Sequence, residues 1–512
     1  PGLFNRSRLK KAPCFTIIKT TRLRKEWIME KVKSAEKRKG THKISVDKIK
    51  DYLAYFITST DKLLLLLSLV ASVFGICMVY SATLNKASGG FPRDARTMII
   101  AVVLGLILAM LISLVDSDII CKLWPVWAGL SILLMIIVFL FGVAPSSRED
   151  ARTWLNLGLF YFQPSELIKI FFIITFSVHL STVQAQINKI KNVALLLLHA
   201  AVPFVLVAVS GDDGSALVFL LIAIGLLFVA GLNWKYFLGG GLLAAAAVPL
   251  LWMKLNEFQR ARFLSLVHPE DYPTTAYQQN LGLSALANGG FTGQGFLKGA
   301  YTQAGSVPEA QNDMIFTVIG EELGLLGCLA CLLLINLIIF RILRNGKRSL
   351  QSHTQFLCYG MAFMIGFHTL INIAMCLRIG PVIGITLPFF SAGGSSTLCL
   401  YIGLGVIFSV YRSNYNLAKE TNFRLIGVRS PFHADFKDSK NAQSRQVNAG
   451  TEIHTSPVSG VSGNQFSANK LFASLKHSWE EYQSKKNSVP KTGTGNRRRR
   501  TGTNRNRFRK RK

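Results

Sequence analysis

The sequence predicts an all-α, polytopic integral membrane protein with about ten transmembrane helices. Half of its 512 residues are hydrophobic and only 17% are charged, a balance that is unusual for a soluble domain. Apolar runs fill residues 63–412, whereas much of the formal net charge of +31 lies in the two ends of the chain. This segregation favours a membrane domain between two basic segments.

The individual spans are predicted from apolar runs, because a helix crosses the bilayer core with about 20 residues. The first run, Leu63–Leu84, carries no charge and follows a long basic stretch, so we interpret it as a signal anchor. A large extracellular loop, residues 254–314, is expected between spans 7 and 8. The remaining expected spans are Met98–Leu114, Trp124–Val143, Ser165–Leu180, Val193–Val209, Ser215–Gly231, Tyr236–Met253, Ile315–Phe340, Phe356–Cys376 and Phe390–Tyr411.

The orientation is predicted from Lys and Arg, because clustered cations stay on the cytoplasmic side. Both ends of the chain are basic, and so are the connections at residues 189–191 and 341–348. An even number of spans places all four on the cytoplasmic side, so both termini are expected there. The predicted domains are a basic cytoplasmic N-terminal segment (1–62), a transmembrane domain (63–412) and a disordered basic cytoplasmic tail (413–512).

The Arg-rich stretch at residues 497–512 contains no acidic residue. Such stretches bind nucleic acid in some proteins, but beside a membrane the simpler interpretation is attraction to anionic lipid, at about 1 kcal/mol per cation. The membrane is therefore the expected partner of this stretch, and nucleic acid is not.

Charged residues inside expected spans are candidates for function, because charges in hydrocarbon are unfavourable. Glu166 and Lys169 lie three residues apart, the spacing at which opposite charges meet on one helix face. They form either a self-compensating structural pair or part of a polar cavity. In the short turn at residues 210–215, Asp212 or Asp213 is expected to cap the following helix.

The long external loop brings cations and carboxylates to the membrane surface. QRARF supplies Arg260 and Arg262, and VPEAQNDMIF supplies Glu309 and Asp313. The glycine-rich stretch NGGFTGQGFLKG, which begins at Asn288, follows no predicted strand and lacks the spacing of a phosphate loop. We therefore expect a flexible external loop there.

Together these motifs resemble the SEDS family of bacterial cell-wall proteins, whose members include FtsW, RodA and SpoVE. The resemblance runs in order from about Leu63 to Arg412. It is carried by ARTWLNLG, FQPSELIK, GDDGSALVF, QRARF, YQQNLGLSALANGGFTGQG, PEAQNDMIFTVIGEELGLLG and GPVIGITLPFFSAGGSS. The chain departs from the family pattern just before Asp212, just before Asp313 and at Ala392, and these changes spare the carboxylates.

The resemblance implies a peptidoglycan polymerase, a glycosyltransferase that extends glycan strands from lipid II on the outer face of the bacterial cytoplasmic membrane, in cell elongation or division. In this inverting hexosyl transfer, a hydroxyl of the acceptor sugar attacks the anomeric carbon of the donor and expels undecaprenyl diphosphate. The reaction needs a base and positive charge for the leaving group. The resemblance implies that Asp313 is the base, and the alternative is a cap on the next helix.

The candidates for substrate binding are Trp154, Arg152, Arg260, Arg262, Glu309, Glu166, Lys169, Ser395 and Ser396. The arginines present paired donors to diphosphate oxygens, with ordinary loop solvation as the alternative. Trp154 is expected to pack on a sugar face or the lipid, or to anchor at the membrane interface. Glu309 is expected to orient substrate or a metal, whereas Ser395 and Ser396 line the cavity or permit close helix packing.

The resemblance further implies a class B penicillin-binding protein, a transpeptidase, as partner. Lipid II and the undecaprenyl diphosphate-linked glycan are the expected ligands, and a divalent cation, Mg²⁺ or Mn²⁺, is considered as a cofactor without an assigned site. Two other functions stay open, a flippase that transports lipid II and a noncatalytic cell-wall scaffold. A polymerase needs Asp313 outside the hydrocarbon, whereas a flippase does not.

Overall fold

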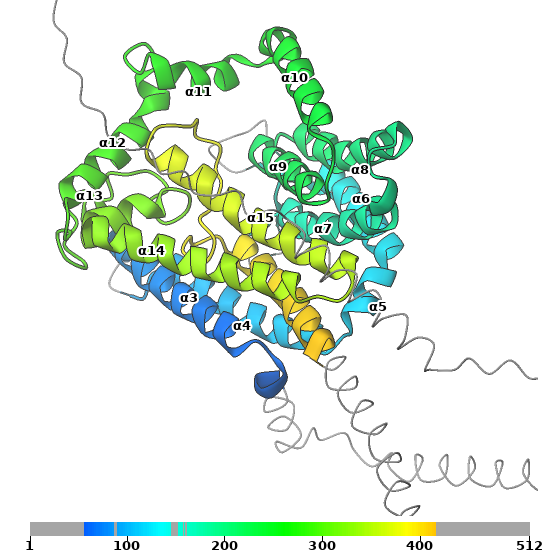
Figure 1. Ribbon diagram of the computed structural model, residues 1–512. Helices are drawn as coiled ribbons and strands as arrows, with labels where there is room; N and C mark the ends of the chain where they lie inside the picture. Colours follow the sequence, from blue (N-terminus) through cyan, green and yellow to red (C-terminus); the bar gives the residue numbers. More distant parts are fainter. Residues whose placement is uncertain (1–55, 87–89, 145–151, 157, 159–160, 416–512) are drawn as a thin grey trace, which may run out of the picture. The chain divides into compact units, whose positions relative to one another are not determined.

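The computed structural model describes residues 56–86, 90–144, 152–156, 158 and 161–415 (Figure 1). Most of these residues are helical, and short connections join the helices. The predicted N-terminal segment and C-terminal tail lie almost entirely outside the described residues. Their boundaries and the disorder of the tail therefore stay predictions.

Each expected membrane span contains an apolar helix. Nine described helices are long and apolar enough to cross a bilayer: α3 (Lys62–Thr83), α4 (Arg93–Ser113), α6 (Trp124–Phe141), α7 (Pro164–Val183), α8 (Ile190–Val209), α10 (Trp234–Lys254), α14 (Ile315–Lys347), α15 (Ser352–Cys376) and a last helix, Gly394–Tyr415. A tenth apolar helix, α9 (Asp213–Val229), has 17 residues, or about 26 Å, slightly less than a typical hydrocarbon core. The chain is therefore a multi-pass, all-α membrane protein, as predicted.

Shorter elements lie in the connections. They are η1 (Leu84–Lys86), α5 (Ser117–Lys122), β1 (Leu155–Asn156), β2 (Tyr161–Phe162), η2 (Gln184–Gln186), α11 (Glu257–Val267), α12 (Pro273–Gly289) and α13 (Ala300–Gln303). Strands β1 and β2 form an antiparallel hairpin. The loop expected between spans 7 and 8 is largely helical, and its α12 packs against both α11 and α14.

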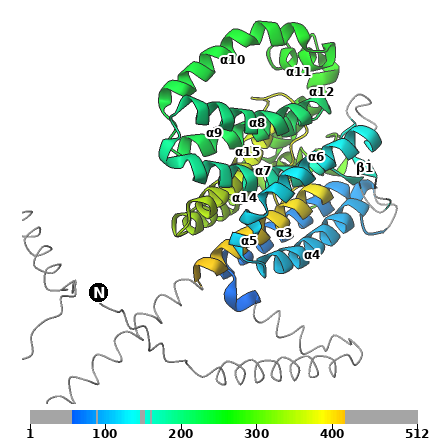
Figure 2. The same ribbon diagram turned by 90° about the vertical axis from the view of Figure 1, so that its right-hand side faces the viewer.

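The last helix is the most enclosed of the apolar helices. In the last helix, 78% of the most apolar 18-residue window is buried. In α10, none of the corresponding window is buried. Figures 1 and 2 show α10 at the edge of the helix bundle. Small residues let the last helix approach α4: a Cβ on Gly105 would lie 2.7 Å from the Cβ of Tyr401, and one on Gly405 2.7 Å from the Cα of Ala109.

Helix α14 is longer than a bilayer requires and is kinked near its N-terminal end. Its 33 residues correspond to about 50 Å, and Gly324 interrupts the helix with a φ of +66°. A Cβ at this position would collide with the backbone of Gly293, and the N–H of Gln294 donates to the carbonyl oxygen of Glu321 at 2.9 Å. The expectation of a flexible glycine-rich loop was wrong, because the loop is held against the kink.

A buried ion pair joins the start of α3 to α14. Asp61 is fully buried, and one of its carboxylate oxygens accepts from Arg341 Nε at 2.7 Å and from Asn345 Nδ2 at 2.8 Å. The other oxygen accepts from the N–H of Leu64 at 3.3 Å and so caps α3. One carboxylate therefore fixes two long helices against each other.

Replacing Asp61 with Ala is expected to lower the free energy of unfolding by about 3 kcal/mol, because it leaves the largely buried Arg341 without its partner. Thermal unfolding in detergent measures the change. Asp94→Ala, in the first turn of α4, is the control and is expected to cost less than about 1 kcal/mol. Equal shifts for the two variants would show that the ion pair does not stabilise the bundle.

Candidate functional site

Polar side chains gather where the starts of α7, α9 and α14 meet the loop between α15 and the last helix. Asp313 lies two residues before the first residue of α14 and is buried, with 8% of the residue exposed. Met314 occupies the N-cap position of α14, and no side chain accepts a capping hydrogen bond at this end of the helix. Gln278 of α12 donates to the Asp313 carboxylate at a long 3.4 Å. Asp313 is therefore a buried carboxylate that does not cap the helix.

Burial raises the pKa of the Asp313 carboxyl from 3.8 to about 7. The carboxylate of Glu309 raises this pKa further, whereas the backbone N–H of Asp313, the guanidinium of Arg262 and the amide of Gln278 lower it. A carboxyl group with this pKa exchanges its proton readily at neutral pH. That property suits a general acid or base.

The structure separates the two arginines of the QRARF motif, which lies on α11. Arg260 donates through Nε to the carbonyl oxygen of Trp252 at 3.1 Å and through Nη2 to that of Met253 at 3.0 Å. It therefore holds α11 to the end of α10. The guanidinium of Arg262 acts electrostatically on the carboxylate of Asp313. Arg262 is therefore the arginine of this motif that belongs to the acidic site, which is formed by Asp313 and Glu309.

The segment before Asp313 is fixed at several points. Glu309 adopts a φ of +53° and accepts from Asn312 Nδ2 at 2.6 Å. The carbonyl oxygen of Gln311 accepts from the N–H of Ala392 at 2.9 Å, and its Oε1 accepts from Lys86 Nζ at 3.1 Å. The segment is thus tied to the loop before the last helix and to η1.

A cavity of about 290 Å³ leads from the apolar faces of α8 and α9 to Arg262. Its polar end also contains Asp213 and Gln259, and Gln259 Nε2 donates to Asp213 Oδ2 at 2.9 Å. The lining residues are Phe204, Ala208, Asp213, Ala216, Leu217, Leu220, Leu255, Gln259, Arg262, Phe263, Pro381 and Ile383. The cavity is therefore apolar, with a polar end that carries one carboxylate and one guanidinium, which suits an amphipathic ligand.

Glu166 and Lys169 meet as their spacing predicts. The Nζ of the fully buried Lys169 lies 2.7 Å from Glu166 Oε1 and 2.9 Å from Nε2 of His368 on α15. Because an ammonium group only donates hydrogen bonds, the Nε2 of His368 is the acceptor. His368 was not among the residues predicted from the sequence, although a histidine within the apolar run of α15 was an available signal.

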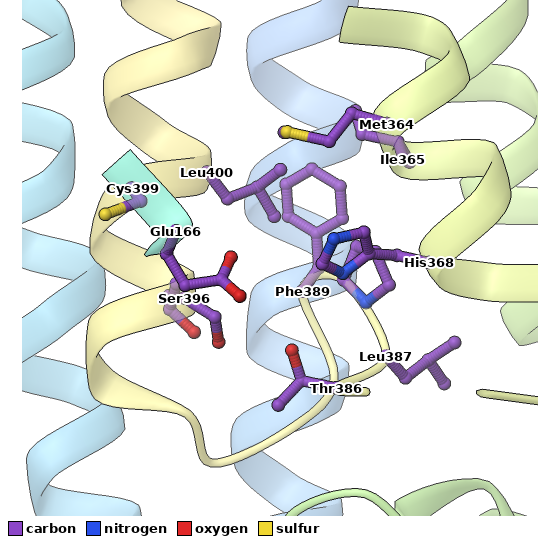
Figure 3. Close-up of a pocket in the computed structure, with 12 residues that line it drawn as sticks. Glu166, Met364, Ile365, His368, Thr386, Leu387, Phe389, Ser396, Cys399 and Leu400 are labelled. Carbon is purple, nitrogen blue, oxygen red and sulfur yellow. The ribbon is translucent and has the colours of Figure 1, made fainter. Parts of the chain in front are cut away.

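Figure 3 shows Glu166, His368, Thr386 and Ser396 around a small cavity. Its volume of about 20 Å³ is enough for about one water molecule. Ser396 therefore lines this small cavity, and its predicted contact with substrate stays a prediction. The sequence left two interpretations of Glu166 open, a structural ion pair and part of a polar cavity. The structure shows both, because Glu166 pairs with Lys169 and also lines this cavity.

Ser395, unlike Ser396, is not among the residues that line this cavity. Its Oγ accepts from the backbone N–H of Gln163 at 3.0 Å and so connects the last helix to the start of α7. Gln163 Nε2 and Ser165 Oγ both donate to Asp212 Oδ2, at 2.8 and 2.7 Å. Asp212 Oδ1 accepts from the N–H of Ser215 at 3.1 Å and caps α9, as expected.

Trp154 and Arg152 lie beside the β-hairpin. Trp154 is half-buried and exchanges backbone hydrogen bonds with Val143, at 2.7 and 3.2 Å, whereas Arg152 is exposed. Their contacts with substrate stay predictions.

One group of side chains among the described residues has the spacing of metal ligands. His268, Glu270 and Asp271, between α11 and α12, offer ligand atoms that all lie within 4.8 Å of one another. Imidazole and carboxylate ligands together suit a divalent cation such as Mn²⁺. All three residues are exposed, and His268 Nδ1 lies 3.6 Å from Glu270 Oε1. Glu309, the residue expected to orient a metal, is not a member of this group.

These features define a multi-pass membrane protein with a buried acidic site between its helices and the long connection from α10 to α14. The family model described as "Cell cycle protein", for FtsW, RodA and SpoVE, matches residues 61–416. The chain therefore belongs to the FtsW/RodA/SpoVE family, and the resemblance found in its motifs is confirmed.

Individual relatives match over nearly their whole length. Peptidoglycan glycosyltransferase MrdB of Escherichia coli (strain K12) is 31% identical over 371 residues, which are 70% of this chain and 95% of that protein. The probable peptidoglycan glycosyltransferase FtsW of Geobacter sp. (strain M18) is 31% identical over 360 residues, or 68% of this chain and 96% of that protein.

Two solved structures have the same fold. A chain from a study of how a peptidoglycan synthase complex coordinates polymerization and crosslinking superposes with a TM-score of 0.60 at 28% identity, over 70% of this chain and 98% of that one. The rod shape determining protein RodA of Thermus thermophilus gives a TM-score of 0.53 at 26% identity, with the same coverage of 70% and 98%.

Lys169→Met is expected to lower the free energy of unfolding by about 3–5 kcal/mol, because it leaves the carboxylate of Glu166 buried without a cation. Adding Glu166→Gln should recover much of this loss. A double-mutant cycle by thermal unfolding in detergent measures the coupling. Purely additive losses would show that the two side chains do not depend on each other.

Proposed function

We propose that this chain is a peptidoglycan glycosyltransferase that polymerises lipid II at the outer face of the cytoplasmic membrane. Its family membership supports the proposal, because relatives matched over nearly their whole length are named peptidoglycan glycosyltransferases. The observation that carries it is Asp313, a buried carboxylate outside the membrane-spanning helices whose pKa is raised to about 7. Arg262, which acts on this carboxylate, also lines the apolar cavity.

In the proposed reaction Asp313 removes the proton of an acceptor N-acetylglucosamine hydroxyl while that oxygen attacks the anomeric carbon of the donor N-acetylmuramic acid. The bond between this carbon and the diphosphate breaks, and undecaprenyl diphosphate leaves with the bonding electrons. Direct displacement inverts the anomeric configuration. Arg262 stabilises the negative charge on the leaving diphosphate, and the apolar cavity receives the start of the polyprenyl chain.

The proposed partner is a class B penicillin-binding protein, which would crosslink the strands. A related chain belongs to a peptidoglycan synthase complex that coordinates polymerization with crosslinking, which supports this proposal. A divalent cation, Mg²⁺ or Mn²⁺, is a proposed cofactor, and His268, Glu270 and Asp271 are the described residues that would hold it; it would supply positive charge. The proposed topology, with both termini cytoplasmic, rests on the distribution of Lys and Arg.

The second candidate function is transport of lipid II across the bilayer. The buried group of Glu166, Lys169 and His368 favours it, because ionisable residues inside membrane helices often mark transport pathways. Transport does not require a base at Asp313, whereas polymerisation does. A noncatalytic scaffold would require neither the base nor the buried group.

Asp313→Asn is expected to lower the rate of glycan polymerisation by about 10²–10⁴-fold, because the amide keeps the shape of the carboxyl but cannot accept the proton. Glycan ladders from fluorescent lipid II, made by the purified full-length protein, measure the rate, and thermal unfolding verifies that the variant folds.

Glu257→Gln is the matched control, since Glu257 is an exposed carboxylate in the first turn of α11. It is expected to change the rate by less than about twofold. Full activity in folded Asp313→Asn would exclude Asp313 as the base. A wild-type protein that makes no ladder would instead favour transport or a scaffold.

The rate of polymerisation is expected to rise with pH through about 7, because only the ionised form of Asp313 is a base. The raised pKa also means that the folded protein binds a proton that the unfolded chain has released. The contribution of Asp313 to stability therefore falls as the pH rises from 3.8 to about 7. Initial rates across this range locate the midpoint, and a midpoint near 3.8 would contradict the burial of the base.

A further inference from the structure

Asn372 of α15 connects two segments that are distant in sequence. The residue is fully buried, and its Nδ2 donates to the carbonyl oxygens of Asp313 and Ile385, both at 2.7 Å. These two bonds use both hydrogens of the amide group. Asp313 lies 59 positions before Asn372, and Ile385 lies in the loop between α15 and the last helix.

These contacts hold the backbone of Asp313 and do not involve its carboxylate. One turn after Asn372, the Sγ of Cys376 lies 3.6 Å from the same carbonyl oxygen of Asp313. The carboxylate, in contrast, has the long contact of 3.4 Å with Gln278. A group that must accept a proton from substrate needs this arrangement, in which its position is fixed but its lone pairs are available.

The same loop touches the segment of Asp313 a second time, since the N–H of Ala392 donates to the carbonyl oxygen of Gln311. We propose that Asn372 is a positioning residue, which fixes the backbone of Asp313 relative to α15 and this loop so that the carboxylate reaches the acceptor hydroxyl. This inference rests on the proposed polymerase function.

The chemistry explains why such fixing matters. A base acts when it lies about 2.6–3.2 Å from the proton donor, and a misplacement of about 1 Å can lower a rate about 100-fold. Removing the amide of Asn372 would leave the carbonyl of Ile385 without this donor and that of Asp313 with only the weak donor of the Cys376 thiol, so we expect the segment to shift.

The chain offers a matched control in Gln279 of α12. This residue is also buried, and its Nε2 also donates to two carbonyl oxygens, those of Met375 and Gly380, both at 2.8 Å. Neither carbonyl belongs to the segment of Asp313. Gln279→Leu therefore removes an equivalent pair of bonds without releasing the base.

The test compares Asn372→Leu and Gln279→Leu in the full-length protein, by polymerisation of fluorescent lipid II and by thermal unfolding. Both variants are expected to lose similar stability. Asn372→Leu is expected to lower kcat about 100-fold with KM for lipid II changed less than about threefold. Gln279→Leu is expected to keep kcat within about threefold of the wild type.

The pH profile separates positioning from a merely structural role. In Asn372→Leu the segment of Asp313 is expected to move toward water. The pH midpoint of its polymerisation rate should then lie below that of the wild type, because burial is the largest influence on the pKa of Asp313. The charged and titratable groups that face it are Glu309 on its own segment, Arg262 on α11 and Cys376 on α15.

If Asn372→Leu does not fold, Asn372→Ser serves instead, because a hydroxyl keeps one donor. It is expected to lower kcat about 10-fold, with the same direction of shift in the pH midpoint. Equal effects of the Asn372 and Gln279 variants on kcat, with an unchanged midpoint, would overturn the inference and leave the polymerase function intact. Absence of polymerisation by the wild type would overturn both.

Discussion

The energetic cost of burying a carboxylate governs how the helices of this protein meet their loops. Asp61 is neutralised by Arg341, and Glu166 by Lys169, at 2.7 Å in both pairs. Asp313 has no such close partner among the described side chains, and its pKa rises to about 7 instead. The carboxylate of Asp61 holds α3 to α14, and that of Glu166 is neutralised within α7. Asp313 instead exchanges its proton near neutral pH, which makes it available for proton transfer.

The rest of the site keeps this unfavourable carboxylate in place. Glu321, fully buried in α14, accepts from the backbone N–H groups of Tyr301 and Thr302 at 2.8 and 2.9 Å and so anchors α13, which directly follows the glycine-rich stretch. Asn372 fixes the backbone of Asp313 from the other side. Stable contacts around Asp313 thus offset the cost of its buried side chain, as expected for a preorganised site.

Hydropathy and local spacing predicted much of this structure. The membrane helices follow from the lengths of the apolar runs, and the pair of Glu166 and Lys169 follows from the geometry of one helix turn. The cap formed by Asp212 is likewise a local feature. The contact between Lys169 and His368 spans 199 positions, and it could not be predicted because it depends on how α7 packs against α15.

The site was predicted less completely, because its contacts also depend on how distant segments pack against one another. Arg260 and Arg262 look equivalent in sequence, yet the path of α11 directs one to the end of α10 and the other to Asp313. The glycine-rich loop looked flexible because its partner, the kink at Gly324, lies more than 25 positions later in the chain. The family resemblance singled out Asp313, whereas the structure revealed its burial.

Polymerisation and transport differ most directly in what happens to lipid II in a sealed membrane. The decisive measurement uses proteoliposomes of the full-length protein with fluorescent lipid II in only one leaflet, and follows strand formation and leaflet exchange in the same sample. We expect strands when lipid II lies in the leaflet beside the loop of residues 254–314, with no exchange between leaflets. Exchange of lipid II without strand formation would contradict the assignment of this chain as a polymerase.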